Sequence, residues 1–237
     1  EIMKKIFIII GIIIFGLCSQ SQAMGGYTNL VAGYRFEDNA SATQIMDYSG
    51  NNGIGTITGA VSSIGKCGVG KRFDGDDIIT IADSEKLDIT TAISIVAWVR
   101  PTQLGDVRFI FDKNTAVSNF AYRFLKSAAN KVQFTLYTTG EVDRTALSVS
   151  TIGTNTYTHI AGTYDGINIK IYVNGILENT SSATGLITTS NSSLLIGKNV
   201  DNSSQNWIGD MDEIAIFNRG LTESEVRQTM LGLSPGE

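Results

Sequence analysis

The residue types closest to catalytic chemistry lie near the end of the chain, where Asp210 directly precedes an alternating, largely apolar stretch, 211–217, that contains Asp212 and Glu213. Residues two apart in an extended strand point to the same side, so Asp210 and Asp212 are expected on one face and Glu213 on the other. Ile214 takes the next position on the face of the two aspartates. Paired carboxyl groups, one acting as acid and one as nucleophile or base, are what glycoside hydrolysis requires.

Other nucleophiles and metal ligands are scarce. The chain has one histidine, His159, and two cysteines. A zinc site needs several histidine or cysteine ligands, so we expect His159 to be a hydrogen-bonded structural residue. Cys67 is the only cysteine after the leader segment described next. We therefore expect it to be a small buried residue without a disulfide, rather than a nucleophile.

The first residues have the pattern of a secretory signal peptide. Lys4 and Lys5 precede an apolar run, 6–17, and a polar patch that ends in Ser21-Gln22-Ala23. The run is too short for a transmembrane helix. We expect cleavage after Ala23, a secreted location, extracellular or periplasmic, and no transmembrane segment in the mature chain. A lipoprotein signal through Cys18 fits less well, because Leu17 is bulky where such signals have a small residue.

The net charge of the chain restricts the classes of partner that it is expected to bind. The formal net charge is −5, and loss of the leader, with its two lysines and one glutamate, makes it more negative. An acidic surface repels phosphate backbones, so nucleic acid is not an expected partner. No repeat, charge block or linker divides the remainder. We expect one domain over 24–233 and a tail over 234–237.

Strand signals dominate that domain. In 158–177, the turn pairs Asp165-Gly166 and Asn174-Gly175 separate alternating apolar residues, which predicts a three-stranded antiparallel meander. Similar patterns predict strands over 30–37, 54–61, 78–82, 93–99, 109–111, 122–125, 132–137, 145–149, 194–196 and 211–217. The one helix signal is at 221–227, where Thr222 and Glu225 have the capping-box spacing. This distribution predicts an all-β fold, a two-sheet antiparallel β-sandwich or jelly roll.

Seven short motifs occur in an order that resembles a known family. The chain resembles the bacterial LamG-like jelly-roll domains of the concanavalin A-like lectin/glucanase superfamily over residues 30–230. The motifs are YRFE (34–37), DYSGN (47–51), FDGDD (73–77), ISIVAWVRP (93–101), TYDG (163–166), YVNG (172–175) and GDMDEIAIFNRGL (209–221). The resemblance implies a concanavalin A-like jelly roll of two stacked antiparallel sheets, with the first and last strands as neighbours. Members of this family are mostly binding modules.

The resemblance also bears on catalysis. Laminarinase-type relatives carry a nucleophile, a supporting aspartate and an acid/base glutamate at alternate positions of one strand. Asp210 and Asp212 match the first two positions, but Ile214 replaces the acid/base. We therefore expect no catalytic residues and no hydrolase activity.

A structural calcium ion is the cofactor that the resemblance suggests. Glu37, Asp47 and Asp212 lie at family-matched positions, and hard cations bind several carboxylate and carbonyl oxygens. Carbonyls of the loop 49–53 would complete the set. In the alternative interpretation, Asp47 is only a turn residue and Asp212 only accepts hydrogen bonds from local backbone amides.

Three aromatic residues are candidates to stack on a sugar ring. Trp207 follows a polar loop, 201–206, although the family has an inward-packing aromatic there. Tyr122 and Tyr137 are further candidates, whereas Trp98 lies in an apolar strand and is expected in the core. The sequence thus favours a secreted module that binds a polysaccharide or surface glycan, or acts as an adhesin. The rival is a cell-surface structural or assembly protein that binds other proteins, and a glycosidase is a distant third.

Overall fold

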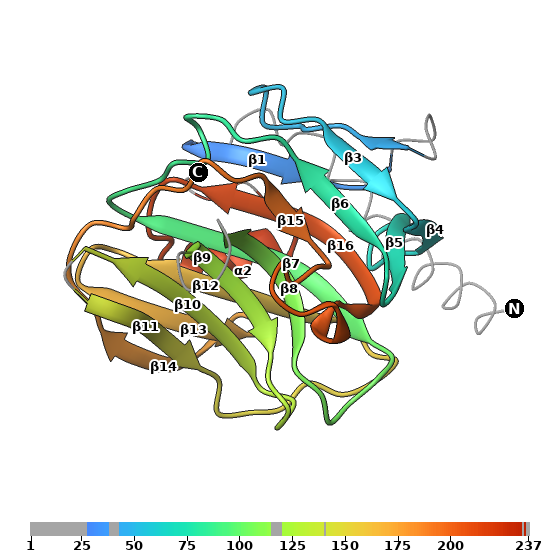
Figure 1. Ribbon diagram of the computed structural model, residues 1–237. Coiled ribbons are helices and arrows are strands. Elements are labelled where there is room, and N and C mark those ends of the chain that lie inside the picture. Colours follow the sequence, from blue (N-terminus) through green and yellow to red (C-terminus); the bar gives the residue numbers. More distant parts are fainter. Residues whose placement is uncertain (1–27, 38–42, 115–119, 140, 234, 236–237) are drawn as a thin grey trace, which may run out of the picture.

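The computed structural model describes residues 28–37, 43–114, 120–139, 141–233 and 235. In this part of the chain the strands form two antiparallel sheets stacked face to face, each with eight strands (Figure 1). The predicted all-β sandwich is therefore confirmed. The signal-peptide prediction falls on residues 1–27, outside the described residues. No described helix is long and apolar enough to cross a membrane.

We call the two layers sheet 1 and sheet 2. In sheet 1 the order is β14 (Ile176–Ser182), β13 (Asn168–Val173), β12 (Thr158–Tyr164), β7 (Ile93–Pro101), β16 (Ile208–Phe217), β5 (Val69–Asp74) and β4 (Val61–Ile64), with β1 (Leu30–Tyr34) also paired to β16. In sheet 2 the order is β11 (Glu141–Leu147), β10 (Val132–Thr138), β9 (Phe120–Lys126), β8 (Arg108–Asn114), β15 (Leu194–Ile196), β6 (Ile78–Ile81), β3 (Gly55–Thr58) and β2 (Gln44–Ile45).

The predicted strand neighbours are present. β1 pairs with β16 from Leu30↔Phe217 to Tyr34↔Ile214, so the first and last strands are adjacent. The predicted meander is β12-β13-β14, and its second turn has positive φ at both Asn174 (50°) and Gly175 (74°), as a two-residue hairpin turn requires.

One predicted strand is divided. The segment 54–61 was expected to be a single strand, but β3 lies in sheet 2 and β4 begins at Val61 in sheet 1. Gly59 has a φ of 86° between them. This left-handed conformation, which glycine adopts without strain, turns the chain from one layer to the other.

The main core fills the space between the sheets. Phe124 and Phe134 of sheet 2 are fully buried and pack ring against ring, with centroids 5.4 Å apart. Opposite them, β12 has Gly162, where a Cβ atom would lie only 2.3 Å from the Phe134 ring. The glycine therefore allows an aromatic layer to approach the backbone of the facing sheet.

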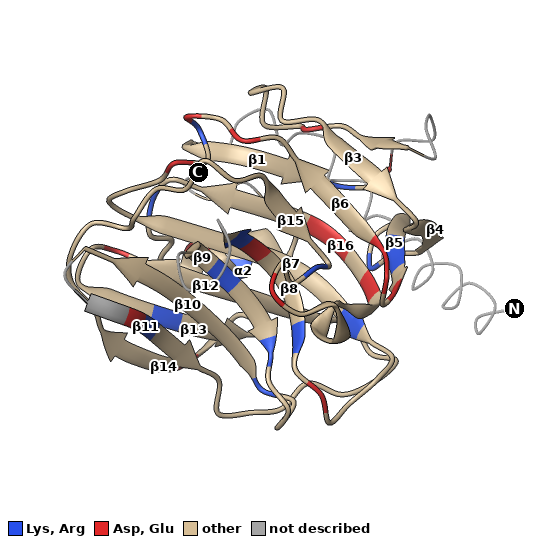
Figure 2. Ribbon diagram, in the orientation of Figure 1, with Lys and Arg blue, Asp and Glu red and all other residues tan. Residues whose placement is uncertain are grey.

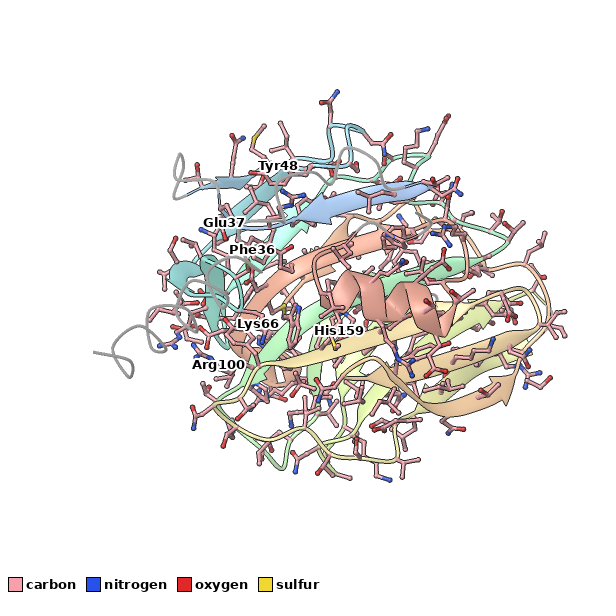
Figure 3. All side chains as sticks on the ribbon, turned by 180° about the vertical axis from the view of Figure 1, so that it is seen from behind. Phe36, Glu37, Tyr48, Lys66, Arg100 and His159 are labelled. Atoms are coloured by element: carbon pink, nitrogen blue, oxygen red, sulfur yellow. The ribbon has the colours of Figure 1, made fainter. Side chains whose placement is uncertain are left out.

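A second, smaller cluster lies on the outer side of sheet 1, under helix α2 (Glu223–Met230). Thr222 and Glu225 form the predicted capping box at the start of this helix. Val226 is the buried residue of the helix and packs with Phe217 and Tyr172. Figure 3 shows the helix lying on this face of the sheet. The helix does not cover the outer face of β5 or of the first half of β16.

Candidate functional site

Asp47 organises the loop after β1 instead of lying with the other predicted calcium ligands. Its Oδ1 accepts hydrogen bonds from the backbone amides of Gly33 (2.9 Å) and Ser49 (2.8 Å). Its Oδ2 accepts from the Ser49 hydroxyl (2.7 Å) and the Gly53 amide (2.9 Å). Both carboxylate oxygens are thus engaged by the protein, which matches the turn-residue interpretation of Asp47.

Glu37 and Asp212 do come together, at the loop between β4 and β5. Glu37 Oε1 accepts a hydrogen bond from the Val69 amide at 3.0 Å, and Asp212 Oδ2 accepts from the Cys67 amide at 2.9 Å. Burial raises the pKa of Asp212 to about 8, with further contributions from the negative charges of Glu213 and Glu37. This pair of predicted ligands therefore belongs to one acidic group.

Glu213 is the third member of this group, contrary to the prediction that it would face the other way. A β-bulge between Asp212 and Ala215 shifts the register of β16 against β7, and Glu213 has a φ of 48°. As a result Ile214 points into the main core. The pKa of Glu213 is raised to about 7, mainly by burial. The positive charge of Arg35 acts to lower this pKa, and the negative charge of Glu37 acts to raise it.

The acidic group has the donor chemistry of a cation site, but the predicted triad does not form one. Glu213 Oε1 is buried and has no hydrogen-bond partner among the described residues. Carboxylates at this spacing repel one another, and a hard cation would offset the repulsion. Among the described residues, only one group of three or more His, Cys, Asp or Glu side chains has its ligand atoms all within 4.8 Å of one another. This group is Asp74, Asp76 and Asp77, in the β5–β6 turn. Calcium therefore stays a prediction, with Glu213 a better third ligand than Asp47.

Cys67, in the same loop, differs from its prediction. It is partly exposed and it is not a free thiol in this structure. The Cys67 amide contributes to the site through its hydrogen bond to Asp212. The expectation that Cys67 is buried was therefore wrong, because the loop that carries it covers the outer face of sheet 1 instead of entering the core.

Asp210, two residues before Asp212, holds two arginines. Its carboxylate is fully buried and receives Arg72 Nε on Oδ1 and Arg100 Nε on Oδ2, each at 3.0 Å. Burial acts to raise the pKa of Asp210, but the side chains of Arg72, Ser63 and Arg100 outweigh it and the pKa is lowered. Figure 2 shows acidic positions of β16 beside basic positions of β5. Sequence reasoning singled out Asp210 but missed both arginines.

These contacts also bear on catalysis. Asp210 is engaged by two guanidinium groups, and Asp212 is fully buried beneath the β4–β5 loop. The Asp212 carboxyl lies so close to Gly65 that a Cβ atom there would be 2.5 Å from Oδ2. A general acid or nucleophile must reach the scissile bond. In this conformation neither carboxyl is open to a substrate.

Two of the three predicted sugar-stacking residues are in the core. Trp207 and Tyr122 are fully buried, and the Tyr122 hydroxyl donates to the Leu87 carbonyl at 3.2 Å. A ligand in solvent cannot reach either ring, so these two predictions were wrong. Tyr137 is partly exposed and meets Phe120 edge to face, with ring centroids 5.9 Å apart. It is the one predicted aromatic that remains available.

Tyr137 lies on an outer face crossed by a continuous row of side chains. The row consists of residues that lie opposite one another on neighbouring strands, in six cross-strand pairs. Along each strand these residues alternate with core residues, so their side chains face away from the core. The row is Thr56, Thr80, Leu195, Asp112, Arg123, Thr135 and Thr145. Arg123 is held between the rings of Phe120 (3.7 Å) and Phe109 (5.4 Å) and lies 3.3 Å from Asp112.

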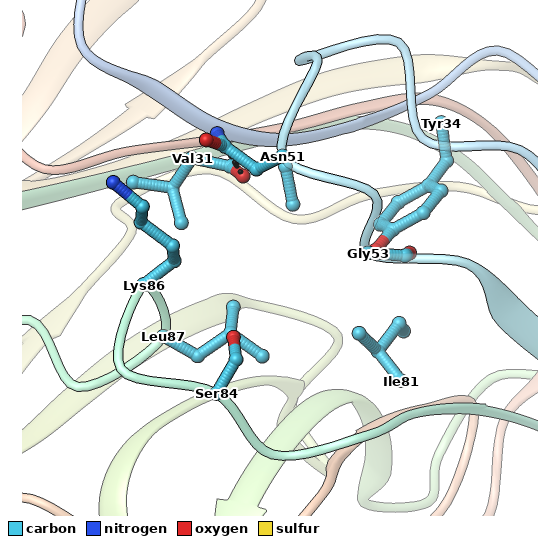
Figure 4. Close-up of a pocket in the computed structure, with 9 residues that line it drawn as sticks. Val31, Tyr34, Asn51, Gly53, Ile81, Ser84, Lys86 and Leu87 are labelled. Atoms are coloured by element: carbon cyan, nitrogen blue, oxygen red, sulfur yellow. Dashed lines mark hydrogen bonds between the residues drawn. The ribbon is translucent and has the colours of Figure 1, made fainter.

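A small hollow occurs where β1 meets the loops 51–53 and 84–87 (Figure 4). Tyr34, Ser84 and Lys86 are among the residues that line it, and the Tyr34 hydroxyl donates to the Gly53 carbonyl at 2.7 Å. Its volume of about 10 Å³ accommodates one water molecule at most. This hollow is too small for a sugar.

Comparison with known proteins places the fold in a family. The model of the Laminin_G_3 family, described as the concanavalin A-like lectin/glucanases superfamily, matches residues 73–227. The chain therefore belongs to this superfamily, as its motifs indicated. No curated protein matches the sequence.

Solved structures share the fold at low sequence identity. Domain 4 of the arabinanase AbnA from Geobacillus stearothermophilus, solved with arabinotriose, is 23% identical, with a TM-score of 0.71, over 86% of this chain and 99% of that domain. The binding domain of Paraclostridial Mosquitocidal Protein 1 is 20% identical, with a TM-score of 0.70, over 85% of this chain and 52% of that one. The binding domain of botulinum neurotoxin DC, solved with rat synaptotagmin II, is 16% identical, with a TM-score of 0.63, over 85% and 51%. The chain thus spans about half of the two toxin domains.

Proposed function

We propose that this chain is an exported, non-catalytic binding module whose ligand is a glycan, bound on the outer face of sheet 2. The observation that carries the proposal is the partial exposure of Tyr137 on the same outer face as the cross-strand row of β8 to β11. Arg123 and Thr145 of this row are partly exposed, so an aromatic ring near a guanidinium and a hydroxyl group can pack against a sugar and hydrogen-bond its hydroxyls. The arabinotriose in the similar arabinanase domain supports the same ligand class.

Titration of arabino-oligosaccharides and a wider glycan panel against the purified chain tests this proposal. Tyr137→Ala should weaken binding several-fold, and Tyr137→Phe, which keeps the ring, should retain most of it. Ile167→Ala, at an exposed residue of the β12–β13 turn, is the matched surface control. Absence of binding to every glycan, or equal binding by the Tyr137→Ala and Ile167→Ala variants, would refute the proposal.

Export is proposed from the leader pattern. Lys4, Lys5 and the apolar run that follows are typical of a segment removed on secretion. Secreted protein should begin at Met24, as mass analysis of its N-terminus would show. A cytoplasmic protein that retains Met3 would contradict this.

The second candidate function is attachment to another protein at the cell surface. It is favoured by β4, an edge strand of sheet 1 on which Val61 is 58% and Ile64 is 79% exposed. Apolar edge strands are common sites of strand addition. Light scattering of the pure chain, and of a Val61→Lys, Ile64→Lys double variant, would detect self-association and show whether this edge causes it.

A further inference from the structure

The outer face of sheet 1 carries a cationic group built around one buried anion. Arg100, Asp210 and Arg72 face one another on β7, β16 and β5 in a single cross-strand row. Asp210 holds both arginines through their Nε atoms at 3.0 Å and is itself fully buried. Arg72 is half exposed and Arg100 is 23% exposed. The aspartate is thus enclosed, whereas the side chains of both arginines reach solvent.

The hydrogen-bond inventory shows that these arginines keep donors to spare. Among the described residues, every hydrogen bond that the side chains of Arg72 and Arg100 donate goes to Asp210, from both Nε atoms and from Nη2 of Arg72. Each guanidinium has five N–H donors in a planar fork. The two terminal nitrogens of Arg100 and Nη1 of Arg72 therefore remain for another acceptor.

Arg100 is also held by an aromatic ring. Its guanidinium lies 4.7 Å from the centroid of the Tyr157 ring, and the Tyr157 hydroxyl donates to the Ile64 carbonyl at 2.9 Å. Tyr157 is thus tied to the end of β4 while its ring supports the cation. An arginine held by both an ion pair and an aromatic ring loses less conformational entropy when it binds a ligand.

A third cation extends the group along the strands. Lys66 is exposed, and its Nζ lies 4.3 Å from the centroid of the Trp98 ring. Trp98 pairs with Asp212 in the row adjacent to that of Arg100 and Asp210. Rows two residues apart are separated by about 7 Å along a strand. Figure 3 shows Lys66 and Arg100 on this same face.

The charge balance of the group is positive. Arg72 and Arg100 share one carboxylate, Asp210, and Lys66 adds a third cation in the adjacent row, where Glu37 accepts a hydrogen bond from Val69, although the chain as a whole has a net charge of −5. Asp212 of the adjacent row is fully buried beneath the β4–β5 loop, so it does not present its carboxyl to a ligand on this face. A structural ion pair needs only one arginine for one aspartate. The second arginine and the lysine leave a local surplus that an anion would neutralise.

We propose that Arg72, Arg100 and Lys66 form a second binding site, on the sheet opposite to the Tyr137 face, for the carboxylate or sulfate groups of an acidic polysaccharide. A guanidinium fork matches such groups in a bidentate manner, and the two rows allow successive charged sugars of one chain to be bound. The site goes beyond the proposed function because it is on another face and selects for charge. It rests on that proposal only in taking the anion carrier to be a glycan.

Calorimetric titration with three oligosaccharides of equal length tests the site: an oligogalacturonate, a sulfated galactan fragment and an uncharged arabino-oligosaccharide. The proteins are the wild type and the Arg72→Gln, Arg72→Lys, Arg100→Gln, Arg227→Gln and Tyr137→Ala variants. Arg227 is the matched control, since it is a 55% exposed arginine paired with one carboxylate, Glu223. Arg72→Gln and Arg227→Gln change the net charge equally, and half-exposed Arg72 can be replaced without opening the core.

We expect the wild type to bind one or both anionic oligosaccharides, with affinity that falls as salt is raised. Arg72→Gln and Arg100→Gln should each weaken this binding about tenfold or more, Arg72→Lys should weaken it by less, and Arg227→Gln should leave it unchanged. Comparison of the affinities for the oligogalacturonate and the sulfated galactan fragment identifies which anion is preferred. Binding of the uncharged probe should respond to Tyr137→Ala and not to Arg72→Gln.

Equal loss in the Arg72→Gln and Arg227→Gln variants would overturn the site, because it would reflect net charge alone. Binding only to the uncharged probe would overturn it too, while leaving the proposed glycan function in place. If no oligosaccharide of either kind binds, both proposals fail.

Discussion

Nζ of Lys113 lies 2.6 Å from Oδ1 of Asp83, and the lysine side chain is completely buried. The same ammonium donates to the carbonyls of Ser190 (2.7 Å) and Ser192 (2.9 Å). One side chain of β8 thereby ties together two loops of sheet 2 that are far apart in sequence. Carboxylate and carbonyl oxygens around a buried cation are the surroundings that other proteins give to a bound metal ion.

Lys113→Met should destabilise the fold by about 3 kcal/mol, because it leaves a carboxylate and two carbonyls without their shared donor. Urea unfolding of the purified protein measures this. Lys86→Met, at an exposed lysine in the same loop region, should change the stability by no more than about 0.5 kcal/mol. Equal stability of the two variants would show that the Lys113 contacts contribute nothing.

Asp47→Ala should lower the free energy of unfolding by about 2–4 kcal/mol, because it removes the acceptor for three backbone amides and one hydroxyl around the loop after β1. Thermal unfolding with a matched Asp76→Ala variant, at an exposed turn aspartate, provides the comparison. A loss no larger than that of the control would mean that the loop holds its conformation without the carboxylate.

Calcium should raise the melting temperature by about 5–10 °C at a hundredfold excess over its Kd, because it binds only the folded chain. The acidic group of Glu37, Asp212 and Glu213 is the expected location. Asp212→Ala and Glu213→Gln should remove the shift, whereas Asp47→Ala should lower the baseline stability and keep the shift.

Calorimetric scans of metal-stripped protein, with and without added calcium, make the measurement. A melting curve of the stripped wild type that is indifferent to calcium would exclude the site. Loss of the calcium shift in Asp47→Ala, but not in Glu213→Gln, would restore the ligand set expected from the sequence.

His159 should make the protein sensitive to acid. Burial lowers the pKa of His159 from 6.5 to about 3, and its Nδ1 has no hydrogen-bond partner among the described residues. Between these values the unfolded chain binds the proton and the folded chain does not, so stability falls as the pH falls from 6.5 towards 3. The slope attributable to this residue is about 1.4 kcal/mol per pH unit.

The His159→Gln variant carries no titrating group, so its stability should depend less on pH over this interval. Denaturant titrations at several pH values, compared between the two proteins, isolate the histidine from the carboxyl groups common to both. Parallel pH profiles would contradict the expected role of His159.

Much of the architecture was predictable because it depends on local patterns. The Asn174-Gly175 turn, the alternation along β13 and the Thr222–Glu225 capping box each reside within a few residues, and all three are present as predicted. The adjacency of β1 and β16 followed from family resemblance, not from periodicity, and the pairing confirms it.

The errors arose where a local pattern was interrupted by a single residue. Strict alternation placed Glu213 opposite Asp212, but the bulge at Glu213 adds one residue to β16 and changes the side of everything beyond it. The other errors concerned burial. Tyr122 and Trp207 have side chains suited to binding sugars, and only the packing of the two sheets shows that both are enclosed.

The sequence by itself determined the two-sheet sandwich, its meander, the cap of its helix and the scarcity of nucleophiles, because turn chemistry and side-chain periodicity act between near neighbours. Tertiary structure decided which side chains complete each site. Arg72 reaches Asp210 across 138 positions of sequence, and Arg100 across 110. No local pattern encodes such a contact, because strand order and register bring those three side chains into one row.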